Sequence, residues 1–82
     1  DLQDALAQLS AAQKRYEISH EEWVMNQRLE EGERKRLRSG DSHVFLVNIR
    51  EQATADSGLR EIEALVEYTK GEAHLDFVQG KP

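Results

Sequence analysis

One short turn that contains a glycine separates two long segments without proline. The first segment, residues 2–38, is rich in alanine, leucine, glutamine, glutamate, lysine and arginine, which favour helix, and it holds a single glycine, Gly32. The second segment runs from about residue 43 to residue 78. At Ser39-Gly40-Asp41-Ser42, glycine suits the left-handed position that ends a helix, and Asp41 or Ser42 can cap the next helix. The pattern predicts helix, tight turn, helix.

Two long helices joined by so short a turn must lie antiparallel, each about 54 Å long if it has about 36 residues. We therefore predict an all-α fold: one antiparallel, coiled-coil-like hairpin over residues 1–82, with helices at about 2–38 and 43–78 and a turn at 39–42. Two alternatives stay open. Gly58 could divide the second helix, and residues 44–49, rich in β-branched and aromatic side chains, could form a short strand. Because no partner strand is evident, helix is preferred there.

Composition argues against several classes of function. The chain has 82 residues, with 11 Lys+Arg against 16 Asp+Glu, a net charge of −5 and no cysteine. This balance disfavours nucleic-acid binding, which needs a basic face. The longest apolar run, residues 44–47, is far shorter than the roughly 18 residues that cross a bilayer. A chain of this length buries only about 60% of its unfolded surface, which argues against a deep enzyme cleft.

The basic residues gather at the end of the first predicted helix, at Arg34-Lys35-Arg36 and Arg38. Cations there interact favourably with the negative end of the helix dipole, and Glu30–Arg34 and Glu31–Lys35 have the spacing of helical ion pairs. A solvated helix end is therefore preferred over a dedicated contact patch.

The polar residues form no recognisable catalytic or metal-binding pattern. His20, His43 and His74 are far apart and would not converge in a hairpin, and the residues after His20 lack the second histidine of a zinc-protease helix. The five glycines are scattered rather than gathered in a phosphate loop. We expect no enzyme activity, no cofactor and no metal site.

Apolar residues mark two sides of the first predicted helix. One stripe has members seven residues apart, which is the spacing of a coiled-coil seam, and it includes Leu2, Leu9, Tyr16 and Trp23. The second stripe falls roughly opposite and contains Ala11, Ile18, Met25 and Leu29.

The second predicted helix repeats this arrangement. Its main stripe contains Ala55, Leu59, Ile62, Val66, Thr69 and Ala73. Across from it lie Leu46, Ile49, Ala53, Ala64, Tyr68 and Leu75. We predict helix packing through Leu9, Tyr16, Trp23, Leu59, Ile62 and Val66.

A lone hairpin can bury only one stripe on each helix, so the second stripes need further helices from the same chain or from others. The pattern therefore predicts a part of a larger helical barrel or bundle, and self-association of the chain. The alternative is that small residues such as Ala11, Ala53 and Ala64 merely tolerate solvent.

The residues around the turn resemble a known family. The segment from Arg36 to Ala53 has an arginine before a glycine, a polar turn, an aliphatic run and a helix with arginine and glutamine. It is similar to the helix–turn–helix signature of the TolC-like outer-membrane efflux proteins (outer membrane factors). Residues 68–75 and Gly80 resemble the family's closing pattern of tyrosine, alanine, leucine and a final glycine, and residues 11–16 and 30–38 fit the preceding helix. The resemblance covers most of the chain and is greatest to the second of the family's two repeats.

The resemblance implies a periplasmic hairpin of an efflux or secretion duct. Family members are trimers whose hairpins form a hollow helical barrel, continued by a β-barrel in the outer membrane of the bacterial cell envelope. The tip, defined here as Arg38, Gly40, Asp41, Ser42 and His43, would contact a membrane-fusion adaptor protein and the inner-membrane pump. The fragment itself is expected to be soluble and to form a dimer or a larger species.

The chain also departs from the family pattern. Some members close the duct with acidic residues shortly after the turn, whereas residues 46–49 here are Leu-Val-Asn-Ile. The outer-membrane strands are not part of this sequence. A different function stays open: a stand-alone coiled-coil interaction module that self-associates into a bundle.

Overall fold

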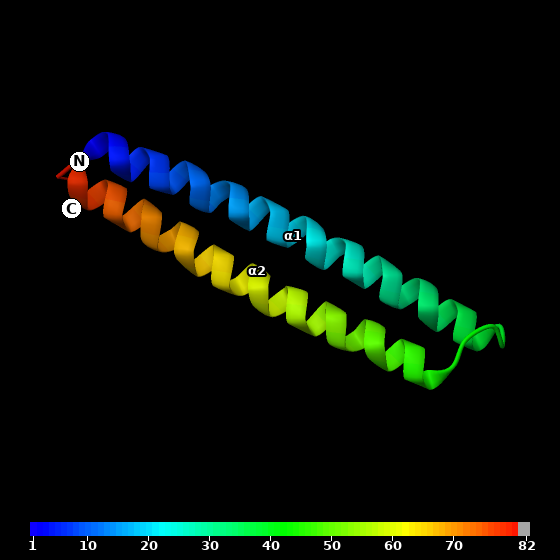
Figure 1. Cartoon of the computed structure of the whole chain (residues 1–82). Helices are drawn as coiled ribbons and strands as arrows, with labels where there is room; N and C mark the ends of the chain where they lie inside the picture. Colours follow the sequence, from blue (N-terminus) through cyan, green and yellow to red (C-terminus); the bar gives the residue numbers. More distant parts are fainter. Residues whose placement is uncertain (81–82) are drawn as a thin grey trace.

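The chain folds into two long antiparallel helices joined by a short connection (Figure 1). A computed structural model describes residues 1–80, so the last two residues of the predicted 1–82 unit lie outside the described part. Helix α1 spans Leu2–Arg38 and helix α2 spans Val44–Val78. The molecule measures 60 × 15 × 14 Å, with both termini at one end and the turn at the other. The prediction of an all-α hairpin is confirmed.

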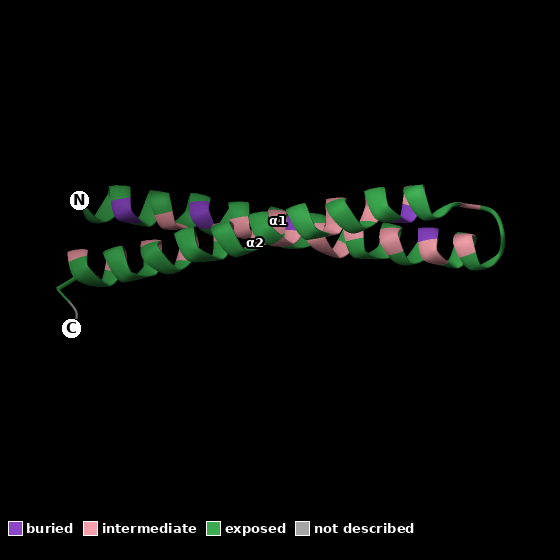
Figure 2. Cartoon of the chain, turned by 90° about the horizontal axis from the view of Figure 1, so that it is seen from below, coloured by how far each residue is buried: buried purple, intermediate pink, exposed green. Residues whose placement is uncertain are grey.

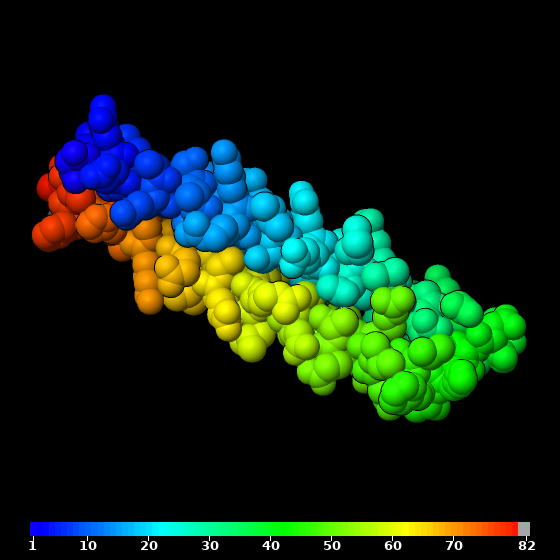
Figure 3. Space-filling model, viewed as in Figure 1, coloured from blue at the N-terminus to red at the C-terminus, as the bar shows by residue number. Residues whose placement is uncertain are grey.

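The second helix is continuous. It begins at Val44, one residue later than expected, and runs through Gly58 without a break. Residues 44–49 belong to α2 and not to a strand. The hairpin therefore has two helices rather than three, and in the space-filling view they lie against each other from the termini to the turn (Figure 3).

The turn ends α1 as the sequence predicts, through a left-handed glycine. Gly40 has φ 82°, its N–H donates to the Leu37 carbonyl at 3.1 Å, and the Asp41 N–H donates to the Arg36 carbonyl at 2.8 Å. These two bonds form a Schellman motif. A side chain at position 40 would be strained, since only glycine adopts this conformation freely.

The expected cap of the second helix is wrong. The residue before α2 is His43, in an extended conformation, and its side chain caps no backbone N–H. Ser42 lies one residue before this N-cap, and its hydroxyl donates to the Glu33 carboxylate at 2.5 Å.

The helices meet along a seam whose residues alternate spacings of three and four. On α1 the seam contains Ala5, Leu9, Ala12, Tyr16, Ser19, Trp23, Asn26, Glu30, Glu33 and Leu37. On α2 it contains Val47, Arg50, Thr54, Ser57, Glu61, Ala64, Tyr68, Gly71, Leu75 and Val78. All are buried or half-buried, and this is the heptad spacing of a coiled coil (Figure 2).

Small residues let the helices approach closely. From the termini to the middle of the hairpin, alternate seam positions are Ala5, Ala12 and Ser19 on α1, and Gly71, Ala64 and Ser57 on α2. A Cβ atom at Gly71 would lie 3.2 Å from Leu9 Cδ1. The helices therefore meet along a narrow seam, and many large apolar side chains stay outside it.

One half of the packing prediction is wrong for this hairpin. Leu9, Tyr16 and Trp23 do lie in the seam. Leu59, Ile62 and Val66 do not, with 58%, 60% and 45% of their surfaces exposed. At this level of α2, the residues that face α1 are Ser57, Glu61, Ala64 and Tyr68. Packing of Leu59, Ile62 and Val66 against a second molecule stays a prediction.

Candidate functional site

The tip of the hairpin is formed by polar residues and a glycine. Gly40, Asp41, Ser42 and His43 line a shallow depression at the turn. Arg36 Nη2 donates to the Asp41 carbonyl at 3.1 Å, which holds the turn against the last turn of α1. The predicted tip residues are thus brought together, and Arg38 stands exposed beside them at the end of α1.

A buried carboxylate anchors the tip to both helices. Glu33 is only 8% exposed and accepts the hydrogen bond from Ser42. It also lies 3.8 Å from Arg36 Nη1 and 3.9 Å from Arg50 Nε. Glu33 was not predicted from the sequence, because the packing prediction considered only the spacing of hydrophobic residues. The available signal was the seam spacing itself, which continues from Leu9 to Leu37 and passes through position 33.

A second charged group lies one turn closer to the termini. Arg34 donates to Glu30 Oε2 through Nη2 at 2.8 Å and through Nε at 3.1 Å, and its Nη2 lies 3.3 Å from Glu51 Oε1 on α2. The predicted pairs Glu30–Arg34 and Glu31–Lys35 are confirmed, the latter at 3.9 Å. The Arg34 guanidinium holds the pKa of the half-buried Glu30 carboxyl below its usual 4.5, with help from the Thr54 hydroxyl and against partial desolvation.

The lowered pKa of Glu30 predicts a loss of stability in acid. A depressed folded-state pKa contributes stability that is present above the unfolded-state value and is lost as pH falls through the folded-state value. We expect the difference in unfolding free energy between wild type and Glu30→Gln to shrink below pH 4.5, where Glu30 becomes protonated. Urea titrations followed by circular dichroism at several pH values measure it. The difference in unfolding free energy between wild type and Arg34→Gln should also shrink below pH 4.5. Differences that do not depend on pH would contradict the lowered pKa of Glu30.

Exposed apolar residues accompany the basic residues of the tip. Val44 and Phe45, the first residues of α2, are both largely exposed. They lie next along the chain from the tip, and the last turn of α1 carries Lys35, Arg36 and Arg38. Phe45 is not among the contact residues predicted from the sequence. An exposed aromatic side chain beside cations suits protein contact.

The outer surface of α2 carries a continuous apolar stripe. This outer stripe of α2 consists of Ala55, Leu59, Ile62, Leu65, Val66, Thr69 and Ala73, all exposed. A mostly apolar groove adjoins it, where Leu59 and Ile62 lie beside Trp23 and Gly58. A Cβ atom at Gly58 would lie 3.3 Å from the Trp23 indole, so glycine leaves room for this ring.

The outer surface of α1 carries a shorter stripe. This outer stripe of α1 consists of Ala11, Ile18, Met25 and Leu29, all exposed. The structure thus bears out the two-sided pattern of large apolar residues on both helices. Of the small residues in the alternative interpretation, Ala11 is exposed, whereas Ala53 and Ala64 are half-buried.

Aromatic rings and a histidine bridge the middle of the hairpin. Tyr16 lies 6.3 Å from the Tyr68 ring and 6.3 Å from the His20 ring, and His20 lies 6.1 Å from the Trp23 ring. His20 Nδ1 is 2.6 Å from Glu61 Oε1 on α2. The rings of Tyr16, Trp23 and Tyr68 are half-buried and His20 is exposed, and the group joins the two helices.

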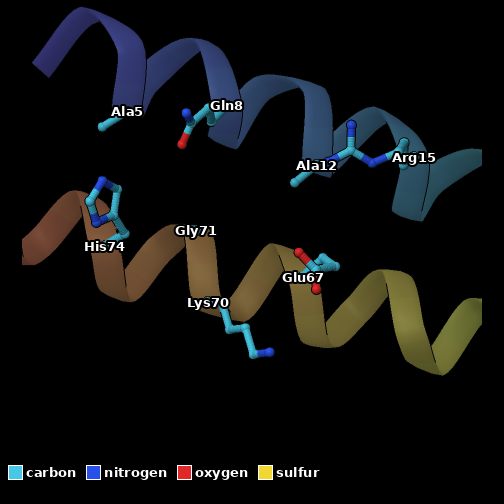
Figure 4. Close-up of a pocket in the computed structure, with 8 residues that line it drawn as sticks. All are labelled: Ala5, Gln8, Ala12, Arg15, Glu67, Lys70, Gly71 and His74. Atoms are coloured by element: carbon cyan, nitrogen blue, oxygen red, sulfur yellow. The ribbon is translucent and has the colours of Figure 1, made fainter. Parts of the chain in front are cut away.

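A polar groove lies between the helices near the termini. Its floor is formed by Ala5, Ala12 and Gly71, and its rim by Gln8, Arg15, Glu67, Lys70 and His74. Ala5 and Ala12 point towards α2, whereas Lys70 points away from α1 (Figure 4). His74 lies here, His20 in the middle and His43 at the tip, so the histidines do not converge. Residues 1–80 hold no group of three or more His, Asp or Glu side chains placed to bind a metal ion.

No protein-family model, curated protein or solved structure matches the chain. Within residues 1–80, neither helix has a stretch long and apolar enough to span a membrane. The tip and the two outer stripes therefore define the candidate interaction surfaces, on the strength of their own geometry.

Proposed function

We propose that this chain is a periplasmic hairpin of a TolC-like outer-membrane efflux or secretion duct. The observation that carries the proposal is the second apolar side of each helix: α1 and α2 share one seam, and each exposes a further stripe. The wall of a helical barrel needs such helices, because each one touches a neighbour on both sides. The glycine turn and the resemblance of residues 36–53 to the family signature add support.

The tip serves as the contact with a membrane-fusion adaptor protein and the inner-membrane pump in this proposal. It lies about one hairpin length from the termini, at the far end of a molecule 60 Å long. Exposed Arg38 and Asp41 offer charges of both signs, and Phe45 offers apolar surface beside them. Mixed charge around an exposed aromatic residue is suited to a specific protein contact.

Exchanging the charges at the tip tests this function. In the full-length trimeric protein, Arg38→Glu combined with Asp41→Lys should reduce efflux about tenfold or more, while trimer assembly measured by native gel stays intact. The exchange leaves the net charge unchanged. Gln3→Glu combined with Gln79→Lys, at the opposite end of the hairpin, serves as the control and should transport normally. Unchanged transport by the tip variant would remove the tip from the adaptor contact.

The same exposed stripes favour a second candidate, a stand-alone coiled-coil module that self-associates into a bundle. The sequence of the gene on either side of this segment distinguishes the two. A duct protein requires a signal peptide, two such hairpin repeats and amphipathic β-strands. A module of the second kind requires none of them.

A further inference from the structure

The two outer stripes lie towards opposite faces of the hairpin. One long edge of the seam carries the Glu22–Arg60 pair at 4.0 Å, and Leu29 follows Glu22 by seven residues on that edge. Ile18 precedes Glu22 by four residues, and Met25 precedes Leu29 by four, so both lie one helical turn away on the same side. The outer stripe of α1 therefore belongs to the Glu22–Arg60 edge.

The outer stripe of α2 belongs to the other edge. That edge carries the Arg34–Glu51 pair, and Leu65 follows Glu51 by fourteen residues, or two heptads. Leu59 and Ile62 border the same edge, where they line the groove beside Trp23. The stripes thus point away from each other, so one partner molecule laid across one face of the hairpin cannot cover both.

The charges beside the outer stripe of α1 are mainly positive. One line of exposed residues, spaced by seven, runs along this stripe and consists of Lys14, Glu21, Arg28 and Lys35. Three of the four are cations. Lys35 pairs with Glu31, whereas Lys14 and Arg28 form no ion pair within residues 1–80.

The charges beside the outer stripe of α2 are mainly negative. Two lines of exposed residues flank it, and their charged members are Glu51 and Glu72 on one side and Asp56, Glu63 and Lys70 on the other. Four of the five are anions. Glu63 and Glu72 take part in no ion pair within the described residues.

We propose that a second copy of this chain covers each stripe, with the outer stripe of α1 packed on the outer stripe of α2 of the neighbouring copy. Pairing a stripe with its own kind would place anions against anions or cations against cations. Pairing unlike stripes joins apolar surface to apolar surface and opposite charges to each other. Like-charge contacts across an interface cost enough to select between such arrangements.

The lengths of the helices fit this contact. Within the hairpin Glu22 lies opposite Arg60, and Arg34 lies opposite Glu51. In a neighbouring copy that is not shifted along the hairpin axis, residues of α2 lie beside α1 of the first copy in the same register. Ile18 of one copy then lies near Leu65 of the other, and Met25 near Leu59. The large residues of the two stripes thus meet, and the tips of all copies point the same way.

Such a contact is heterologous, since it joins two different surfaces. Each copy keeps one free stripe after binding one neighbour, so assembly continues until a ring closes or an open row forms. The expected species in solution is larger than a dimer. The inference rests on the self-association contained in the proposed function. It adds that the outer stripe of α1 binds the outer stripe of α2, which excludes a symmetric dimer.

Charge exchange on the two stripes tests the contact. One variant carries Lys14→Glu and Arg28→Glu, a second carries Glu63→Lys and Glu72→Lys, and a third carries all four substitutions. We expect each two-residue variant to need at least about tenfold more protein to associate, measured by sedimentation and native mass spectrometry. The four-residue variant should associate within about threefold of wild type, because both stripes have changed sign together. Circular dichroism checks that all variants stay helical.

The variants contain their own control for net charge. The four-residue variant has the same net charge as wild type, while the two-residue variants move it in opposite directions, so a net-charge effect would make one of them associate more readily. Mixing the two two-residue variants should restore association, since each then offers a stripe that complements the other. Wild type should also dissociate as salt is raised from 50 mM to 1 M, because screening weakens the charge contacts.

Several outcomes would overturn the inference. A wild-type chain that stops at a dimer would show a symmetric contact, and a four-residue variant as weak as the two-residue variants would show that unlike stripes do not meet. A strictly monomeric wild type at high micromolar concentration would remove homotypic packing altogether, leaving the stripes to a different partner. In each case the duct proposal is judged separately, by transport with the tip variant.

Discussion

Replacing Trp23 by alanine is expected to lower the free energy of unfolding by about 2–3 kcal/mol, more than truncation of any other seam residue. Trp23 is the largest side chain in the seam, it packs against Gly58, and its ring neighbours His20. Removing a fully buried tryptophan costs about 3–5 kcal/mol, and Trp23 is half-buried, so its cost should be smaller. In a chain of this size, that loss corresponds to a drop of about 10–20 °C in melting temperature.

Urea and thermal unfolding followed by circular dichroism at one fixed protein concentration measure this loss. Phe77→Ala is the matched control, because Phe77 is also aromatic and lies on α2 but is 79% exposed. Its replacement should change the unfolding free energy by less than about 0.5 kcal/mol. Equal losses in the two variants would mean that Trp23 stabilises the hairpin no more than an exposed ring does.

Trp23 also illustrates what could be predicted from the sequence. The hairpin follows from two proline-free segments around Gly40, and the seam side of α1 follows from residues spaced by seven, such as Leu9, Tyr16 and Trp23. These features are local, since helix propensity and turn geometry depend on neighbouring residues alone. The boundaries of both helices accordingly lie within one residue of the expected ones.

The seam side of α2 could not be found in the same way. Hydrophobic periodicity selects the stripe with Leu59, Ile62 and Val66, whereas the residues that face α1 include Ser57 and Gly71. Which stripe faces the partner helix depends on how closely the helices approach, and that is a property of both surfaces together. For Glu33, the seam spacing could have shown that the position faces α2, but its contacts with Ser42, Arg36 and Arg50 depend on the tertiary structure.

Enlarging Ser57 is the second change with a large expected effect. Ser57 is 0% exposed at the middle of the seam, and its hydroxyl donates to the Thr54 carbonyl of its own helix at 3.0 Å. Ser57→Leu adds a branched side chain at this fully buried seam position, and we expect it to lower the unfolding free energy by about 3 kcal/mol. This is the upper end of the usual cost of overpacking, because the Ser57 side chain is fully buried between the two helices.

Ser57→Ala separates the effect of size from that of the lost hydroxyl. Alanine favours helix more than serine does, and the hydroxyl bonds only within α2, so this variant should stay within about 1 kcal/mol of wild type. In Ser57→Leu the fluorescence of Trp23 should also shift to longer wavelength, since separated helices expose the indole to water, whereas Ser57→Ala should leave the spectrum unchanged. If leucine were tolerated as well as alanine, the helices could not be as close at this level as the structure places them. The close approach at Ser57 and Gly71 is also what leaves Leu59, Ile62 and Val66 on the outside, so the stability of the hairpin and the apolar surface it offers to a neighbour have one physical origin.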